Sequence, residues 1–175
     1  MKYPDFNVHI NKQTIDKRIE ELGAQLTEDY QDNHINILVL LKGGMVFASD
    51  LIRHIKTSLY VDCMTTSSYN GITSTGKICI EDLDITHLAD KHVLIIDDIL
   101  DTGLTLSSVK NKILAQVSPL SIKTCVLLNK QINQKREIEP DYAAFNIENE
   151  FVVGYGLDFN ELFRNLPHIS IWKQE

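Results

Sequence analysis

The chain has 175 residues, of which 43% are hydrophobic and 23% are charged, and its formal net charge at pH 7 is −7. This length and composition are typical of one globular domain with a sizeable core. The acidic balance argues against nucleic acid as a main partner, because that binding depends on a surplus of lysine and arginine.

Targeting, membrane and metal-cluster signals are weak. The odd set of Cys63, Cys79 and Cys125 lies in apolar runs without the spacing of a zinc site or a disulfide framework. The first residues hold no continuous apolar segment, and no run approaches the roughly 18 residues of a membrane span. We therefore expect a cytoplasmic protein that binds neither membrane nor nucleic acid.

In chain order, the first half predicts helix, strand, helix and strand. Apolar residues at helical spacing predict a surface helix over 11–31, and a continuous apolar run predicts a buried strand over 35–41. Helical spacing resumes over 45–55, and alternation predicts a strand over 58–69. The Gly, Ser, Thr and Asn residues of 70–76 are typical of a mobile loop.

The second half continues the alternation. A strand over 77–83 is expected to pair with the one before the loop, as a hairpin or hood. A buried strand over 91–97, a helix over 104–117 and a buried strand over 122–128 follow. Further strands are predicted over 151–156 and 168–172. The pattern predicts an α/β fold, with 35–41, 91–97 and 122–128 central in a parallel sheet flanked by helices.

Three carboxylates follow the second buried strand, in the segment IIDDILDTGLTLSS (95–108). Asp97 and Asp98 end the apolar run, and Asp101 precedes Thr102 and a helix. Ligands of open parallel sheets bind at the carboxyl ends of strands, and a helix N-terminus offers N–H groups to a phosphate. Carboxylates for sugar hydroxyls or a metal, beside an amide cradle, suit a phosphorylated sugar.

Two other interpretations fit the same letters. Asp101 would be an ordinary helix N-cap with Asp97 and Asp98 solvated, but crowded carboxylates repel one another unless a positive group binds them. DDxxD is also the magnesium-diphosphate motif of helical prenyl synthases, whose acids share a helix face. The β-branched residues before the acids and the Thr-Gly pair after them favour a strand and a turn instead.

The acidic segment resembles the phosphoribosyl-pyrophosphate (PRPP) motif of type I phosphoribosyltransferases. Within that family, the chain resembles the hypoxanthine-guanine branch. The resemblance implies the type I fold as a single domain over 1–175, with a small hood from the N- and C-terminal segments and a flexible loop. Further matching stretches are LLKGGMVF (40–47), SSYNGITSTG (67–76), LLNK (127–130) and FVVGYGLDFNELFRNLPHI (151–169), the last being specific to the 6-oxopurine branch.

The resemblance implies a purine-salvage transferase. A ring nitrogen of hypoxanthine, and of guanine, would displace pyrophosphate from C1′ of PRPP through an oxocarbenium-like state, with Mg²⁺, to give IMP or GMP. It also implies a homodimer or homotetramer. A phosphoribosyltransferase for another base such as xanthine, and a regulator that keeps the PRPP fold without turnover, remain open.

The resemblance also implies roles for the acidic segment. Asp101 would be the catalytic acid/base facing the purine N7, provided that its surroundings raise its pKa. Asp97 and Asp98 would serve the ribose hydroxyls and the metal; many relatives carry Glu-Asp there. The phosphate cradle would be Asp101, Thr102, Gly103, Leu104 and Thr105, with Leu104 in place of a Lys found in some relatives.

Other segments would complete the site by the same resemblance. A cis peptide bond is implied between Leu41 and Lys42, and Lys130 would donate to the purine O6 and so discriminate against adenine. The implied pyrophosphate ligands are Lys42, Gly43, Ser68, Tyr69 and Arg164; the purine ligands are Lys130, Phe151, Val152 and Asp158; and the metal ligands are Asp97, Asp98 and Asp158.

Overall fold

The computed structural model describes residues 7–68, 78–80, 84–133 and 136–172. No helix in these ranges is long and apolar enough to cross a membrane. The elements are β1 (Asn7–Ile10), α1 (Lys12–Asp29), β2 (Ile35–Leu41), α2 (Gly44–Leu51), β3 (Leu59–Ser68), β4 (Ile78–Ile80), the 3₁₀ helix η1 (Thr86–Leu88), β5 (His92–Leu100), α3 (Leu104–Gln116), β6 (Ser121–Lys130), β7 (Tyr142–Ile147), β8 (Val152–Val153) and β9 (Ile169–Ile171).

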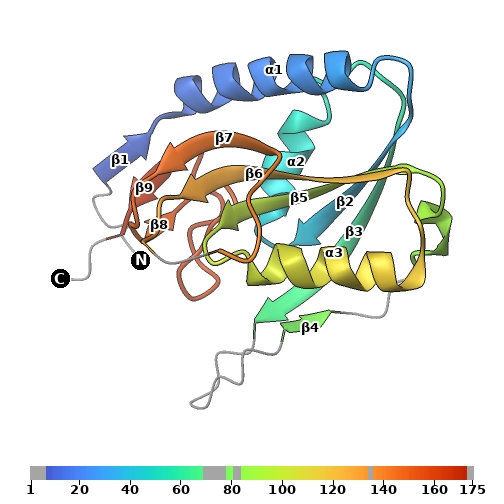
Figure 1. Ribbon diagram of the computed structural model, residues 1–175. Coiled ribbons are helices and arrows are strands. Elements are labelled where there is room, and N and C mark those ends of the chain that lie inside the picture. Colours follow the sequence, from blue (N-terminus) through green and yellow to red (C-terminus); the bar gives the residue numbers. More distant parts are fainter. Residues whose placement is uncertain (1–6, 69–77, 81–83, 134–135, 173–175) are drawn as a thin grey trace.

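A six-stranded sheet in the order β4-β3-β2-β5-β6-β7 forms the centre of the fold (Figure 1). Strands β3, β2, β5, β6 and β7 are parallel, and β4 pairs antiparallel with β3. The predicted α/β fold with β2, β5 and β6 at the centre of a parallel sheet is therefore confirmed.

Two hydrophobic clusters lie on the two faces of this sheet, because successive side chains of a strand point to opposite faces. Ile35, Ile37 and Val39 of β2 pack in the cluster that holds the buried residues of α1 and α2. Leu38 and Leu40 pack in the cluster that holds those of α3. A strand covered on both faces is mostly apolar, which explains the run over 35–41, in which Asn36 is the one polar residue.

A separate three-stranded sheet is built from the two ends of the chain. Its order is β1-β9-β8, with antiparallel pairing throughout. It lies at the end of the main sheet toward which β5 and β6 point (Figure 1). The apolar run at 151–156 therefore contributes only β8, outside the main sheet, since positive φ angles at Gly154, Tyr155 and Gly156 end the strand.

Several predicted boundaries shift for local reasons. The predicted helix over 45–55 ends at Leu51, because His54 N–H bonds to the Leu51 carbonyl at i−3. Strand β5 continues to Leu100, three residues beyond the predicted end, because its ladder with β6 runs on through Ile99 and Leu100. Strands β1 and β7 were not predicted. The predicted loop at 70–76 lies outside the described residues.

The sequence places a tyrosine where α1 meets the main sheet. The Tyr142 hydroxyl on β7 donates to Asp29 Oδ2 at 2.6 Å and accepts from Lys123 Nζ of β6 at 3.0 Å. Lys123 also lies 5.2 Å from the Tyr142 ring centroid. These contacts join the end of α1 to two neighbouring strands.

We expect Tyr142→Phe to destabilise the protein by about 1–2 kcal/mol, because the partly buried Lys123 and the Asp29 carboxylate both lose a hydrogen-bond partner. The loss corresponds to a fall in Tm of about 2–8 °C in thermal unfolding. Tyr60→Phe is the control, since the Tyr60 side chain is 56% exposed. Equal shifts for the two variants would contradict the assignment.

Candidate active site

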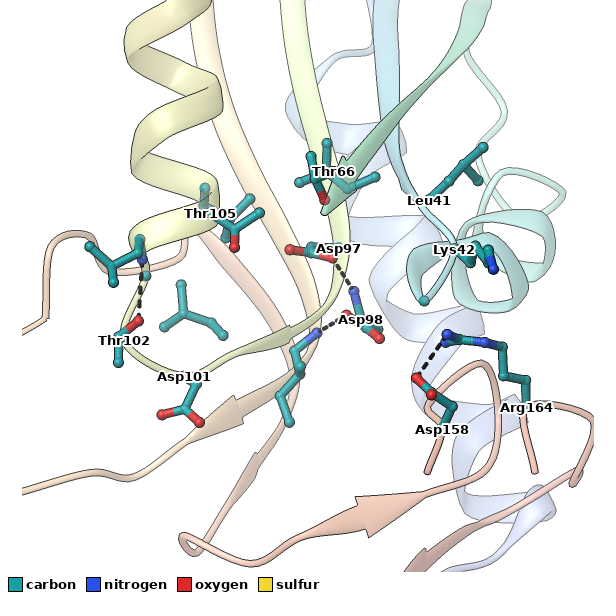
Figure 2. Close-up of a pocket in the computed structure, with 17 residues that line it drawn as sticks. Leu41, Lys42, Thr66, Asp97, Asp98, Asp101, Thr102, Thr105, Asp158 and Arg164 are labelled. Carbon is teal, nitrogen blue, oxygen red and sulfur yellow. Dashed lines mark hydrogen bonds and ion pairs between the residues drawn. The ribbon is translucent and has the colours of Figure 1, made fainter. Parts of the chain in front are cut away.

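A cavity of about 320 Å³ opens at the carboxyl ends of the central strands. Figure 2 shows Asp101 and Thr102 on one side, Lys42, Asp158 and Arg164 on the other, and Asp97 and Asp98 between them. The lining consists of residues 40–43, residues 97–106, Thr66, Asp158 and Arg164. Most of the predicted site residues therefore surround one space, although they come from distant parts of the chain.

The floor of the cavity holds two adjacent carboxylates within β5. Asp97 is 8% exposed, and its Oδ1 accepts the Asp98 N–H at 2.9 Å; Asp98 Oδ1 accepts the Ile99 N–H at 2.8 Å. Burial, followed by the charge of Asp98, raises the pKa of Asp97 well above its ordinary value. Burial also raises the pKa of Asp98, opposed by hydrogen bonds to its carboxylate and by Arg164. The pair thus favours a bound cation or hydroxyl donors.

The first side of the cavity is the turn into α3. Gly103 is the N-cap residue, with φ +80°, and it has no side chain to cap the helix; only the Thr102 hydroxyl accepts the Leu104 N–H, at 3.5 Å. Asp101 is therefore not an ordinary N-cap, and Asp97 and Asp98 lie in a strand, so neither alternative interpretation of the acidic segment holds. Uncapped N–H groups at the start of α3 can donate to an anion, and the hydroxyls of Thr102 and Thr105 lie beside them.

Asp101 faces a lysine from the neighbouring strand. Lys130 is the last residue of β6, and its Nζ lies 3.4 Å from Asp101 Oδ2. The Lys130 side chain is only 11% exposed, whereas Asp101 is half exposed. A half-exposed carboxylate thus lies beside a largely buried ammonium group.

The opposite side joins the β2–α2 turn to the loop after β8. The Leu41–Lys42 peptide bond is cis, as the sequence resemblance implies. Arg164 Nη2 lies 2.8 Å from Asp158 Oδ1, and Nη1 donates to the Gly156 carbonyl at 2.7 Å. This side carries two cations, Lys42 and Arg164, beside the cavity.

Two glycines allow the two sides to meet. A Cβ at Gly43 would overlap the carboxylate of Asp98, and a Cβ at Gly156 would overlap the Gly43 carbonyl oxygen. Gly156 also has φ +101°, which side chains rarely adopt. The backbone of Gly43 therefore packs directly against the Asp98 carboxylate, and the backbone of Gly156 packs directly against that of Gly43.

Some predicted residues do not line the cavity. Lys130 is one of them, although it contacts Asp101, which does. Val152 is buried in β8, and Phe151 is 49% exposed with its ring edge-on to Phe159, at 6.0 Å between centroids. Ser68 ends β3, and Tyr69 lies outside the described residues.

Sequence reasoning missed two polar residues of the site. Thr66 of β3 lines the cavity. Glu161 Oε2 lies 3.1 Å from Lys42 Nζ and 3.2 Å from Arg164 Nη2. The spacing of three between Glu161 and Arg164 in the segment NELFR could have indicated their contact. Nothing local indicated the contact between Glu161 and Lys42.

The carboxylates are suited to a metal that arrives with its ligand. Within the described ranges, no group of three or more His, Cys, Asp or Glu side chains is arranged to hold a metal ion, so the predicted trio of Asp97, Asp98 and Asp158 does not form a closed site. Mg²⁺ commonly takes one or two carboxylates and completes its shell with substrate phosphates and water. The crowded, buried pair at 97–98 fits that arrangement.

The site and the fold together define a phosphoribosyltransferase. The sequence model of the "Phosphoribosyl transferase domain" family matches residues 9–160, and the chain belongs to that family. Within it, the chain belongs to the hypoxanthine-guanine branch, as its relatives show.

Three relatives illustrate the match. The chain is 43% identical to the hypoxanthine-guanine phosphoribosyltransferase of Bacillus subtilis, over 99% of this chain and 96% of that one. It is 41% identical to the hypoxanthine-guanine-xanthine enzyme of Tritrichomonas foetus, over 94% and 90%. The solved structure of the Trypanosoma cruzi hypoxanthine phosphoribosyltransferase in complex with the product IMP superposes with a TM-score of 0.88 at 30% identity, over 99% and 97%.

We expect Asp97→Asn to stabilise the ligand-free protein by about 1 kcal/mol, a rise in Tm of about 2–4 °C at neutral pH. A pKa raised by folding means that Asp97 lowers stability as pH rises through that raised value. The advantage of the variant should therefore shrink on acidification through the same range. Asp32→Asn, at an exposed position, removes the same charge as a control. An advantage independent of pH would contradict this reasoning.

Proposed function

We propose that this enzyme transfers the 5-phosphoribosyl group of PRPP to hypoxanthine and guanine, with release of pyrophosphate, to give IMP and GMP in purine salvage. The observation that carries the proposal is the order of groups across one cavity: Asp101, the start of α3, the buried carboxylates, and the cations Lys42 and Arg164. Lys130 does not line the cavity but contacts Asp101 at 3.4 Å. The names of the relatives support the same substrates.

The ribose 5-phosphate would lie on the α3 side. Its phosphate would accept hydrogen bonds from the N–H groups of 102–105 and from the threonine hydroxyls, with Gly103 allowing close approach. Leu104 is exposed and contributes only its backbone. The ribose hydroxyls would donate to Asp97 and Asp98, which places C1′ over the middle of the cavity.

Asp101 and Lys130 would act on the purine. Asp101 would exchange a proton with N7 as the bond to C1′ forms, since a general acid/base needs hydrogen-bond reach of the atom it serves. Lys130 would donate to O6. Adenine carries an amino group there, so it would offer Lys130 no acceptor at position 6.

The leaving pyrophosphate would lie against Lys42, Gly43 and Arg164. Guanidinium and ammonium groups bind phosphate oxygens well, and the cavity already places both cations on one side. Bound Mg²⁺, held by Asp97 or Asp98 with Asp158 across the cavity, would neutralise charge on the diphosphate. Ser68 and Tyr69 are proposed as further ligands, from the resemblance.

The small sheet β1-β9-β8 is proposed as the hood of a single domain. Phe151 would stack on the base, and the Val152 backbone would read its edge; Val152 begins β8, and Phe151 precedes it. We also propose a cytoplasmic homodimer or homotetramer, which sedimentation velocity would distinguish from a monomer.

The decisive test is formation of IMP, GMP, XMP and AMP from PRPP and Mg²⁺, with Asp101→Asn alongside the wild type. We expect turnover of hypoxanthine and guanine, negligible turnover of adenine, and a loss of about 10²–10⁴-fold in kcat for the variant, the usual size of general acid–base catalysis. The exposed control Asp32→Asn should keep its activity.

Two outcomes would change the proposal. Turnover of xanthine as well would match the relative from Tritrichomonas foetus and would widen the substrate class. Retained binding of PRPP without turnover of any base would favour the regulator.

A further inference from the structure

The carboxylate of Glu161 lies between the two cations of the cavity. Its Oε2 is 3.1 Å from Lys42 Nζ and 3.2 Å from Arg164 Nη2, so one oxygen contacts both. Lys42 belongs to the β2–α2 turn, and Arg164 to the loop after β8. Figure 2 shows Lys42 and Arg164 on the same side of the cavity, with the Arg164 guanidinium turned toward Asp158. An internal anion thus occupies the groups to which we assign the leaving pyrophosphate.

The turn that carries Glu161 is unfavourable for glutamate. Phe159 and Leu162 exchange backbone hydrogen bonds of 3.2 and 3.1 Å around Asn160 and Glu161, which have φ +52° and +63°. Two-residue turns with both φ angles positive favour Asn followed by Gly. Asn160 fits this preference, whereas Glu161 adopts a left-handed conformation that L side chains with a Cβ avoid. An unfavourable residue at a ligand site points to a role for its side chain.

We propose that Glu161 is an internal substitute for pyrophosphate, which pairs with Lys42 and Arg164 in the ligand-free enzyme and must be displaced when the diphosphate binds. The inference rests on the proposed function. Its consequence is that Glu161 weakens diphosphate binding and, by returning to the cations, promotes release of the pyrophosphate product.

The electrostatics agree with a displaceable pair. The hydrogen bonds from Lys42 and Arg164 lower the pKa of Glu161, so its carboxylate is ionised at neutral pH. The Lys42 and Glu161 side chains are each 63% exposed, whereas that of Arg164 is 21% exposed. An exposed ion pair is weak enough for a more highly charged ligand to replace. Asp158, at 2.8 Å, still pairs with Arg164 when Glu161 leaves.

The test is calorimetric titration of inorganic pyrophosphate with MgCl₂ into wild type, Glu161→Gln and the control Glu20→Gln. Glutamine keeps the length of the side chain but removes its charge. We expect the variant to bind pyrophosphate about three- to tenfold more tightly, as the loss of two partly exposed ion pairs allows. Product inhibition by pyrophosphate should strengthen by the same factor. Glu20, exposed on α1, should have no effect.

Glu161→Gly separates the backbone from the side chain. Glycine suits the turn, so this variant should raise Tm by about 2–4 °C and also bind pyrophosphate more tightly. A gain in Tm without tighter binding would overturn the inference, because the Glu161 side chain would then not compete with pyrophosphate.

Two further variants distinguish this inference from the proposed function. Lys42→Met and Arg164→Met should each weaken pyrophosphate binding. If they do so while Glu161→Gln binds no more tightly, or more weakly, the substitute role is wrong and the carboxylate merely holds the cations in place. If neither methionine variant changes pyrophosphate binding, the assignment of the cations fails, and this inference fails with it.

Discussion

The site depends on two neighbouring carboxylates that are buried near the end of one strand, because two like charges held so close need a positive or hydrogen-bond-donating partner. Asp97 and Asp98 are fixed by the β5 ladder and cannot separate, and each accepts a backbone N–H from the next residue. Burying like charges side by side is unfavourable, as their raised pKa values show. The ligand-free enzyme is therefore less stable than it could be at this point, and under the proposed function a cation-bound diphosphate sugar would relieve that cost on binding.

The two sides of the cavity depend on Gly43. It touches the Asp98 carboxylate with its α-carbon and lies under Gly156 with its carbonyl, so three distant segments converge on a residue without a side chain. The start of α3 follows β5 directly along the chain, and there Gly103 lies close to the backbone of Ile138. The acidic side of the site is thus continuous along the chain, whereas the other side is assembled from distant segments.

The same difference decides what the sequence could predict. The acidic segment was recognisable because Asp97, Asp98, Asp101 and the turn at 102–105 are adjacent along the chain. Strand β7, with the sequence YAAFNI, was missed because its alanines and asparagine lack an apolar or alternating pattern, and pairing with β6 supplies its order. The contact from Glu161 to Lys42 spans 119 positions and depends on a turn with two positive φ angles, so no local pattern indicates it. The roles of Phe151 and Val152 rest on resemblance alone.

The single tryptophan of the chain, Trp172, directly follows β9 of the small sheet. Trp172 stacks on Phe159 at 4.6 Å and also meets the Phe163 ring at 5.4 Å, and both phenylalanines belong to the loop that holds Asp158, Glu161 and Arg164. Any rearrangement of that loop changes the surroundings of one indole with no other indole to obscure it. The enzyme therefore contains its own optical reporter, whose fluorescence would follow ligand binding in real time without a label.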